Sequence, residues 1–141
     1  LIDLERARAT GRLAPALVAA ADTAMTRLPD TDGLGVRWLG LRVARAWSEV
    51  GQIADARRVI ARTVPTAAGP FLAVSWRDAA RYAEAAGARD DARRAWQMVR
   101  LLQARAARTE RALADEAAAA LARLADDAPM RAPPAARLPR P

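Results

Sequence analysis

The chain has 141 residues, the length of one domain or of one domain with a tail, and 52% of them are hydrophobic, enough to form a core. It contains no cysteine, histidine, lysine or asparagine, and all 23 basic side chains are arginine. These absences exclude ordinary zinc, haem and copper sites, Ser-His and Cys-His nucleophiles and a lysine Schiff base. We therefore expect a protein that is not an enzyme and that holds no metal and no cofactor.

The formal charge of +7 is spread unevenly along the chain. Residues 1–64 carry ten arginines against seven acids, residues 65–128 carry ten against nine, and residues 129–141 carry three against none. A body this mildly basic does not by itself indicate nucleic-acid binding. The sequence has no run of about 18 apolar residues, so we expect no transmembrane segment.

A first pair of helices is predicted over residues 2–10 and 15–28. Pro15 suits the first turn of a helix, and Pro29 ends the second helix of the pair. The apolar side of this second helix is expected to bury Leu13, Leu17, Ala20, Ala21, Ala24 and Leu28.

A loop over residues 30–35 precedes a second pair, predicted over residues 36–50 and 54–64. The periodicity of the apolar residues places one stripe of each helix in the core. The expected core residues are Leu39, Val43, Ala46, Trp47, Val50, Ala56, Val59, Ile60 and Thr63.

A second loop over residues 65–70 leads to a third pair, predicted over residues 71–86 and from an N-terminal cap at Asp90 onward. Residues 88–128 contain neither glycine nor proline, yet Thr109 followed by Glu110 indicates a break and the start of a seventh helix. The expected core residues are Leu72, Ser75, Trp76, Ala79, Ala80, Ala83, Ala92, Ala95, Trp96, Val99 and Leu102, then Leu113, Ala117, Ala120, Leu121 and Leu124.

Each predicted pair has a glycine at its turn. Gly11, Gly51 and Gly87 are 40 and 36 residues apart, and each is followed five residues later by an alanine. Glycine readily adopts the left-handed backbone that ends a helix, so each is predicted to cap one helix before a tight turn into its antiparallel mate. This recurrence indicates a helical repeat protein.

The pattern resembles tetratricopeptide repeats, which place a glycine at the turn, an alanine five residues on and a large apolar residue four after that. The residues that match are Gly51, Ala56 and Ile60 in the second pair and Gly87, Ala92 and Trp96 in the third, with Trp47 and Ala44 where the family has an aromatic and a small residue. The first pair is a weaker match, with Gly11, Ala16 and Ala20. The resemblance covers about residues 1–105. It departs from the family repeat of about 34 residues in its longer spacings and in its early Pro65.

The resemblance implies an all-α fold over residues 1–128, namely a right-handed α-solenoid of about three antiparallel helix pairs with a C-terminal capping helix. A basic, proline-rich extended tail is expected over residues 129–141. A right-handed α-solenoid of another kind is the structural alternative. In either case a single helix pair cannot bury its apolar face alone, so neighbouring pairs must stack.

In tetratricopeptide repeats the first helix of each pair lines a concave groove. By that resemblance the expected partner-binding residues are Trp38, Leu41, Arg42, Arg45 and Glu49 of the second pair and Val74, Arg77, Asp78 and Arg81 of the third. A guanidinium group forms two parallel hydrogen bonds with a carboxylate, so the expected partner is an acidic protein or peptide. The lysines and asparagines with which the family clamps a C-terminal carboxylate are absent, so that specific ligand is not assigned. The alternative is that these arginines are solvated helix faces, as is expected of Arg57, Arg58, Arg93 and Arg94.

Trp38 lies about one helical turn away from the stripe that contains Leu39 and Val43. The other three tryptophans fall on predicted core stripes. We expect Trp38 either to be a partly exposed anchor for a partner or to pack on the loop at residues 30–35.

The tail contains five prolines, together with Arg131, Arg137 and Arg140, and cannot continue a helix. It is expected either to dock as an extended basic strand on an acidic or aromatic surface or to act as a linker.

The function expected from these features is that of a non-catalytic adaptor or scaffold that binds another protein. The alternatives are a permanent structural subunit of a larger complex and a basic helical-repeat nucleic-acid binder, which the scarcity of tyrosine and phenylalanine disfavours. The acid pairs at residues 90–91 and 126–127 lie at predicted helix ends. Capping and the helix dipole explain at least the first, so these pairs do not indicate an active site.

Overall fold

The computed structural model describes residues 2–28, 34–66, 70–104 and 111–126, and all the regular structure in these ranges is helical. The elements are α1 (Ile2–Ala9), α2 (Pro15–Thr26), α3 (Leu34–Glu49), α4 (Ile53–Thr63), the short 3-10 helix η1 (Val64–Thr66), α5 (Pro70–Ala85), α6 (Arg89–Gln103) and α7 (Arg111–Asp126). The predicted all-α class is therefore confirmed. Within the described ranges, no helix combines the length and the apolar character needed to cross a bilayer.

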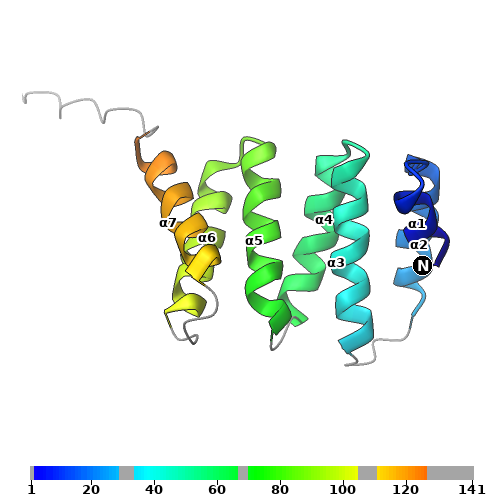
Figure 1. Cartoon of the computed structure of the whole chain (residues 1–141), viewed down its shortest axis with the longest axis horizontal. Coiled ribbons are helices and arrows are strands. Elements are labelled where there is room, and N and C mark those ends of the chain that lie inside the picture. The colour runs from blue at the N-terminus through cyan, green and yellow to red at the C-terminus, as the bar shows by residue number, and fades with distance from the viewer. Residues whose placement is uncertain (1, 29–33, 67–69, 105–110, 127–141) are drawn as a thin grey trace, which may run out of the picture.

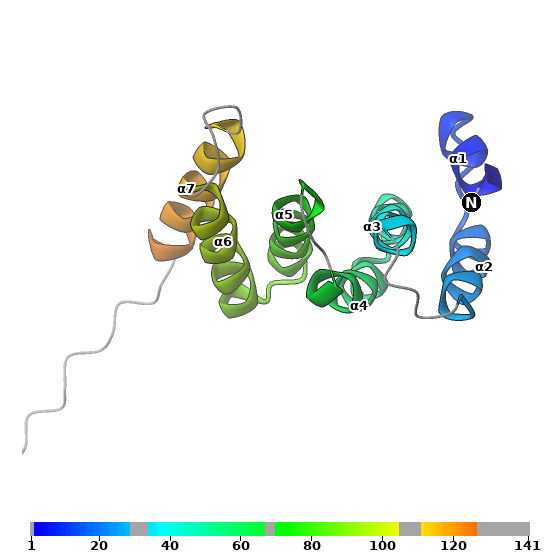
Figure 2. The same cartoon turned by 90° about the horizontal axis from the view of Figure 1, so that it is seen from below.

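The helices stand in a row in chain order, from α1 and α2 at one end to α7 at the other (Figure 1). Turned by 90°, the row has α3 and α5 on one side and α4 on the other (Figure 2). Each helix packs mainly on its neighbours in the chain, as α3 does on α4, α5 on α6 and α6 on α7. Trp76 of α5 packs against both of the hydrophobic clusters that make up the core.

The three predicted glycine turns are confirmed. Gly11, Gly51 and Gly87 have φ angles of 66°, 78° and 70°, the left-handed region that a side chain would strain. At the second turn the N–H of Gln52 donates to the carbonyl of Trp47 at 2.9 Å, and the N–H of Gly51 donates to the carbonyl of Ser48 at 3.0 Å. The equivalent pair of hydrogen bonds closes the other two turns, so all three helices end in the same Schellman motif.

Several predicted helix ends are corrected by the structure. The helix expected to be capped by Asp90 begins at Arg89, and its N-cap residue is Ala88, which forms no side-chain capping bond. Asp90 and Asp91 lie in the first turn instead, where a carboxylate is stabilised by the helix dipole. Helix α3 begins at Leu34, two residues earlier than predicted. The break predicted at Thr109 and Glu110 and the tail at residues 129–141 lie outside the described residues.

The predicted buried face of α2 is partly wrong. Ala20, Ala24 and Leu28 are exposed, whereas Val18 and Asp22 are buried. The physical reason is the pairing of Asp22 with two arginines of α4, which turns that side of the helix inward. Counting apolar residues alone could not place a carboxylate in the core.

The predicted cores of the other helices agree well with the structure. Buried side chains include Val43, Ala46, Trp47, Ala56, Val59, Ile60, Ser75, Ala80, Ala83, Ala92, Ala95, Trp96, Val99, Ala117, Ala120 and Leu124. Leu39, Val50, Trp76, Ala79, Leu113 and Leu121 are partly buried and pack against this core. Leu41, Ala44 and Tyr82 are buried as well, although they were not expected to be.

Candidate functional site

The arginines predicted to face a partner on α3 and α5 pair with carboxylates of neighbouring helices. Arg42 donates to Glu5 of α1 at 2.6 Å, and Arg45 donates to Asp78 of α5 at 2.6 Å. Three more ion pairs complete the set: Arg8 with Glu49, Arg77 with Asp78, and Arg81 with Glu116 of α7. These ion pairs, which we call the ladder, connect α1 to α3, α3 to α5 and α5 to α7.

The ladder recurs at a fixed place in each helix pair. Glu5, Arg45 and Arg81 each lie six residues before a turn glycine, while Arg42 and Asp78 lie nine residues before one. In every case the residue six positions before a turn glycine pairs with a residue two helices further along the chain, on α3, α5 or α7. Most of the predicted site residues are therefore brought together, but as ion pairs between helices of the chain.

Asp78 is the most buried member of the ladder, with a side chain 5% exposed. The carboxylate of Asp78 forms ion pairs with both Arg45 and Arg77, so its negative charge is neutralised where it is buried. A partner carboxylate on this face would have to compete with ion pairs that are already formed.

The three hydrophobic residues of the predicted site are buried or partly buried. Leu41 is 4% exposed and belongs to the core, so its side chain does not line a surface. Trp38 is partly buried, and the guanidinium carbon of Arg42 lies 4.7 Å from the centre of its ring, a cation–π contact. Val74 is partly buried and packs against the core.

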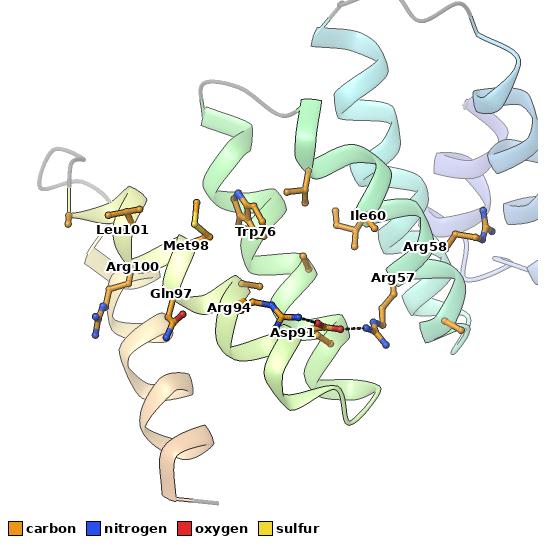
Figure 3. A pocket seen from close by; sticks show the side chains of 17 residues that line it. Arg57, Arg58, Ile60, Trp76, Asp91, Arg94, Gln97, Met98, Arg100 and Leu101 are labelled. Carbon is orange, nitrogen blue, oxygen red and sulfur yellow. Dashed lines mark hydrogen bonds and ion pairs between the residues drawn. The ribbon is translucent and has the colours of Figure 1, made fainter. Parts of the chain in front are cut away.

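A groove of about 1260 Å³, which was not predicted, lies between α4, α5 and α6 (Figure 3). Its floor is apolar, with alanines from all three helices and five larger side chains, Ile60, Val64, Trp76, Met98 and Leu101. Leu101 is 51% exposed, a high value for a leucine among the described residues. Figure 3 shows Trp76, Met98 and Leu101 on the α5 and α6 side of the groove and Ile60 on the α4 side.

The rim of the groove is basic. Arg57 of α4 and Arg94 of α6 share one carboxylate, that of Asp91, and the Arg57 pair measures 2.8 Å. Arg100 also lines the groove, and it has no carboxylate partner within the described part of the chain. Three guanidinium groups therefore stand at the rim against one carboxylate.

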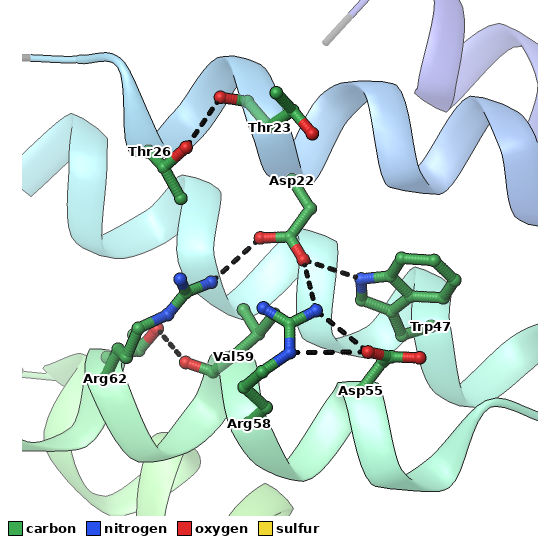
Figure 4. A network of polar contacts seen from close by, with 9 residues as sticks. Asp22, Thr23, Thr26, Trp47, Asp55, Arg58, Val59 and Arg62 are labelled. Carbon is green, nitrogen blue, oxygen red and sulfur yellow. Dashed lines mark hydrogen bonds and ion pairs between the residues drawn. The ribbon is translucent and has the colours of Figure 1, made fainter.

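Arg58 lines the same groove but is directed to the other side of α4. It donates to Asp22 at 2.7 Å and to Asp55 at 2.9 Å (Figure 4). Arg62 donates to the second oxygen of Asp22 at 2.8 Å, and the indole of Trp47 donates to the first at 3.2 Å. At this junction between α2 and α4, a buried carboxylate is held by two guanidinium groups and an indole.

The surroundings of Asp22 set its pKa. Burial raises the pKa, but the hydrogen bonds from Arg58, Trp47 and Arg62 outweigh burial and leave it below the ordinary value. Asp22 is therefore ionised at neutral pH. Burial likewise raises the pKa of Tyr82, helped by the negative charge of Asp78, so the phenol stays neutral.

The described residues offer no cluster of three or more acids that could hold a metal ion. Most of their charged side chains form ion pairs with other residues of the chain. The predicted tail contacts Arg131, Arg137 and Arg140 lie outside the described ranges.

Comparison of the chain with known proteins found no matching family model, no similar curated protein and no similar solved structure.

The sequence contains a signal for the groove beside the core stripe of α6. Met98 and Leu101 are three residues apart and form a second apolar stripe on α6, beside the one that contains Ala95 and Val99. A helix with two adjacent apolar stripes has more apolar surface than one neighbour can cover.

Proposed function

We propose that the chain is a non-catalytic protein-interaction module, an adaptor or scaffold built as a right-handed helical-repeat stack of the tetratricopeptide-like kind. A partner protein binds in the groove between α4, α5 and α6. The observation that carries the proposal is the groove itself, which is open, has an apolar floor and is rimmed by arginines.

The size of the groove supports a macromolecular partner. Pockets for small molecules have volumes of about 300–1000 Å³ and enclose most of the ligand. This groove is larger, at about 1260 Å³, and its leucine is half exposed. An apolar surface of this kind beside polar rims is typical of protein-binding surfaces.

The face that carries the ladder is a less suitable primary site. Arg42, Arg45 and Arg81 already have carboxylate partners. Breaking those pairs would cost part of the binding free energy and would loosen the contacts between repeats. The ion pairs of the ladder therefore mainly stabilise the packing of the helices on one another.

The test is capture of a partner from a nuclease-treated lysate of the source organism with the tagged chain. We expect one protein to be recovered in stoichiometric amount, and Leu101→Asp to abolish its recovery. Leu28→Asp is the matched control, because Leu28 is also an exposed leucine, at 45%, and does not line the groove. Equal recovery by both variants would place the site elsewhere. In a parallel capture from a lysate without nuclease, recovery of nucleic acid that is lost at moderate salt would favour a nucleic-acid binder instead.

A further inference from the structure

We propose that the occupant of the groove is an acidic amphipathic α-helix of a partner protein, about three turns long. The inference rests on the proposed function and specifies the chemistry of the partner.

The length of the groove walls sets the length of the occupant. The lining residues run from position 54 to 64 along α4 and the start of η1, and from position 91 to 104 along α6 and its C-cap. At a rise of about 1.5 Å per residue these walls are about 15 and 20 Å long, which matches about 10–13 residues of a helix.

The backbone of the walls decides between a helix and an extended peptide. All the walls are helices, whose interior N–H and C=O groups bond within the helix, so no strand edge is available for an extended peptide. An extended segment on this apolar floor would bury backbone groups without partners, which is costly. A helix satisfies its own backbone and can present a leucine stripe to Trp76, Met98 and Leu101.

The rim decides the charge of the occupant. Arg57 and Arg94 share Asp91, and Arg100 has no carboxylate partner among the described residues. The indole Nε1 of Trp76 likewise donates no hydrogen bond within that part of the chain. Glutamates on the flanks of a docked helix would therefore meet a rim of net positive charge and an indole N–H that is available as a donor.

The neighbouring junction shows the same chemistry inside the chain. There α2 packs on α3, and the carboxylate of Asp22 accepts hydrogen bonds from Arg58, Arg62 and the Trp47 indole. On the other side of α4 the described residues supply one carboxylate to the groove, that of Asp91, which pairs with Arg57 across it. A partner helix would supply the missing carboxylates.

The chain's own tail is unsuited to the groove. Residues 129–141 contain three arginines, five prolines and no acid, so the segment has the wrong charge and cannot form the helix that the walls require.

The test uses fluorescein-labelled 14-residue helical peptides with leucine at positions i, i+3, i+4 and i+7, measured by fluorescence anisotropy with the whole chain. One peptide has glutamate at the flanking positions, and its matched peptide has lysine there. We expect the glutamate peptide to bind at least about tenfold more tightly than the lysine peptide, with an affinity that falls as salt is raised.

Variants of the chain locate the peptide. We expect Arg100→Glu to weaken binding about fivefold to tenfold and Leu101→Asp to weaken it more. Arg12→Glu and Leu28→Asp are the matched controls and should leave binding unchanged, because both residues are exposed and lie outside the groove. Arg100 has no ion pair to lose within the described residues, so its variant should lower the melting temperature only slightly, through the helix dipole at the last turn of α6.

The inference is overturned if the lysine peptide binds as tightly, if neither peptide binds at about 1 mM, or if the control variants weaken binding equally. It is also overturned if a single-stranded oligonucleotide binds more tightly than the glutamate peptide, or if the groove is closed by a second copy in a dimer that Leu101→Asp dissociates. If neither peptide binds but Leu101→Asp still abolishes capture of a protein, the acidic helix is rejected as the occupant and the proposed interaction module is retained. If capture is also insensitive to Leu101→Asp, the proposed function fails as well.

Discussion

The carboxylate of Asp22 on α2 accepts a hydrogen bond of 3.2 Å from the indole Nε1 of Trp47 on α3. Asp22 is 5% exposed, and Arg58 and Arg62 of α4 complete its partners. One side chain therefore ties three helices together at the junction of the first two helix pairs (Figure 4).

Asp22→Asn should lower the free energy of unfolding by about 2 kcal/mol, because the charge-assisted hydrogen bonds are lost. The cost stays below that of a fully buried ion pair since both arginines remain partly exposed. Asp55→Asn is the matched control, because Asp55 also pairs with Arg58 but is much more exposed, and it should cost less than about 1 kcal/mol. Urea unfolding followed by circular dichroism measures both. Equal losses would contradict the role given to Asp22.

Acid should remove the contribution of Asp22. A carboxyl group whose pKa is lower in the folded than in the unfolded state stabilises the fold fully above its unfolded pKa, near 3.8, and that contribution is lost as the pH falls through the folded pKa. The stability gap between the native chain and Asp22→Asn should therefore be largest near neutral pH and should narrow below about pH 4. Urea unfolding from about pH 6 to about pH 3 checks this. A gap that stays constant over that range would refute it.

Gly40→Ala should destabilise the fold by about 1–3 kcal/mol, although alanine favours helix. A Cβ atom at this position of α3 would collide with the hydroxyl of Thr63 on α4. In a Thr63→Ala background the same substitution should be close to neutral, which a double-mutant cycle measures. Gly35→Ala is the control, because Gly35 lies in the same helix with open space around it, and should stabilise by up to about 1 kcal/mol. Additive effects of the two substitutions would rule out the collision.

Ser75→Ala should leave stability unchanged or raise it by up to about 1 kcal/mol. The Oγ atom of Ser75 is buried on α5 and forms no hydrogen bond within the described residues. Alanine removes a hydroxyl that is desolvated without compensation and leaves only a small space. The melting temperature and the urea midpoint measure the effect. A loss above about 1 kcal/mol would mean that the hydroxyl has a partner, such as a buried water.

The turns were predictable because they are local. The hydrogen bonds by which a glycine ends a helix lie within six residues of the chain, and the same glycine-to-alanine spacing recurs at Gly11, Gly51 and Gly87. The core stripes of α3 to α7 followed for the same reason, since helical periodicity is a property of one segment.

The candidate site depends on distances between segments, which periodicity does not encode. The pairing of Arg45 with Asp78 joins residues 33 apart, and it depends on the register between two stacked helices. The groove depends on how far α4 and α6 are separated across α5, and the inward turn of Asp22 depends on arginines 36 and 40 residues away. From its own helix alone, Arg45 was expected to bind a partner and Arg58 to be solvated, because the carboxylate that each one pairs with lies on another helix.

The charges of the ladder fix the order in which helix pairs can follow one another. Duplicating the third pair would set Arg81 of the first copy against Asp78 of the second, an attractive contact like the native ones. Duplicating the second pair would set Arg45 against a second Arg42, and joining the first pair directly to the third would set Glu5 against Asp78. An engineered chain could therefore be lengthened by duplicating the third pair. Repulsion between like charges would oppose the other two rearrangements.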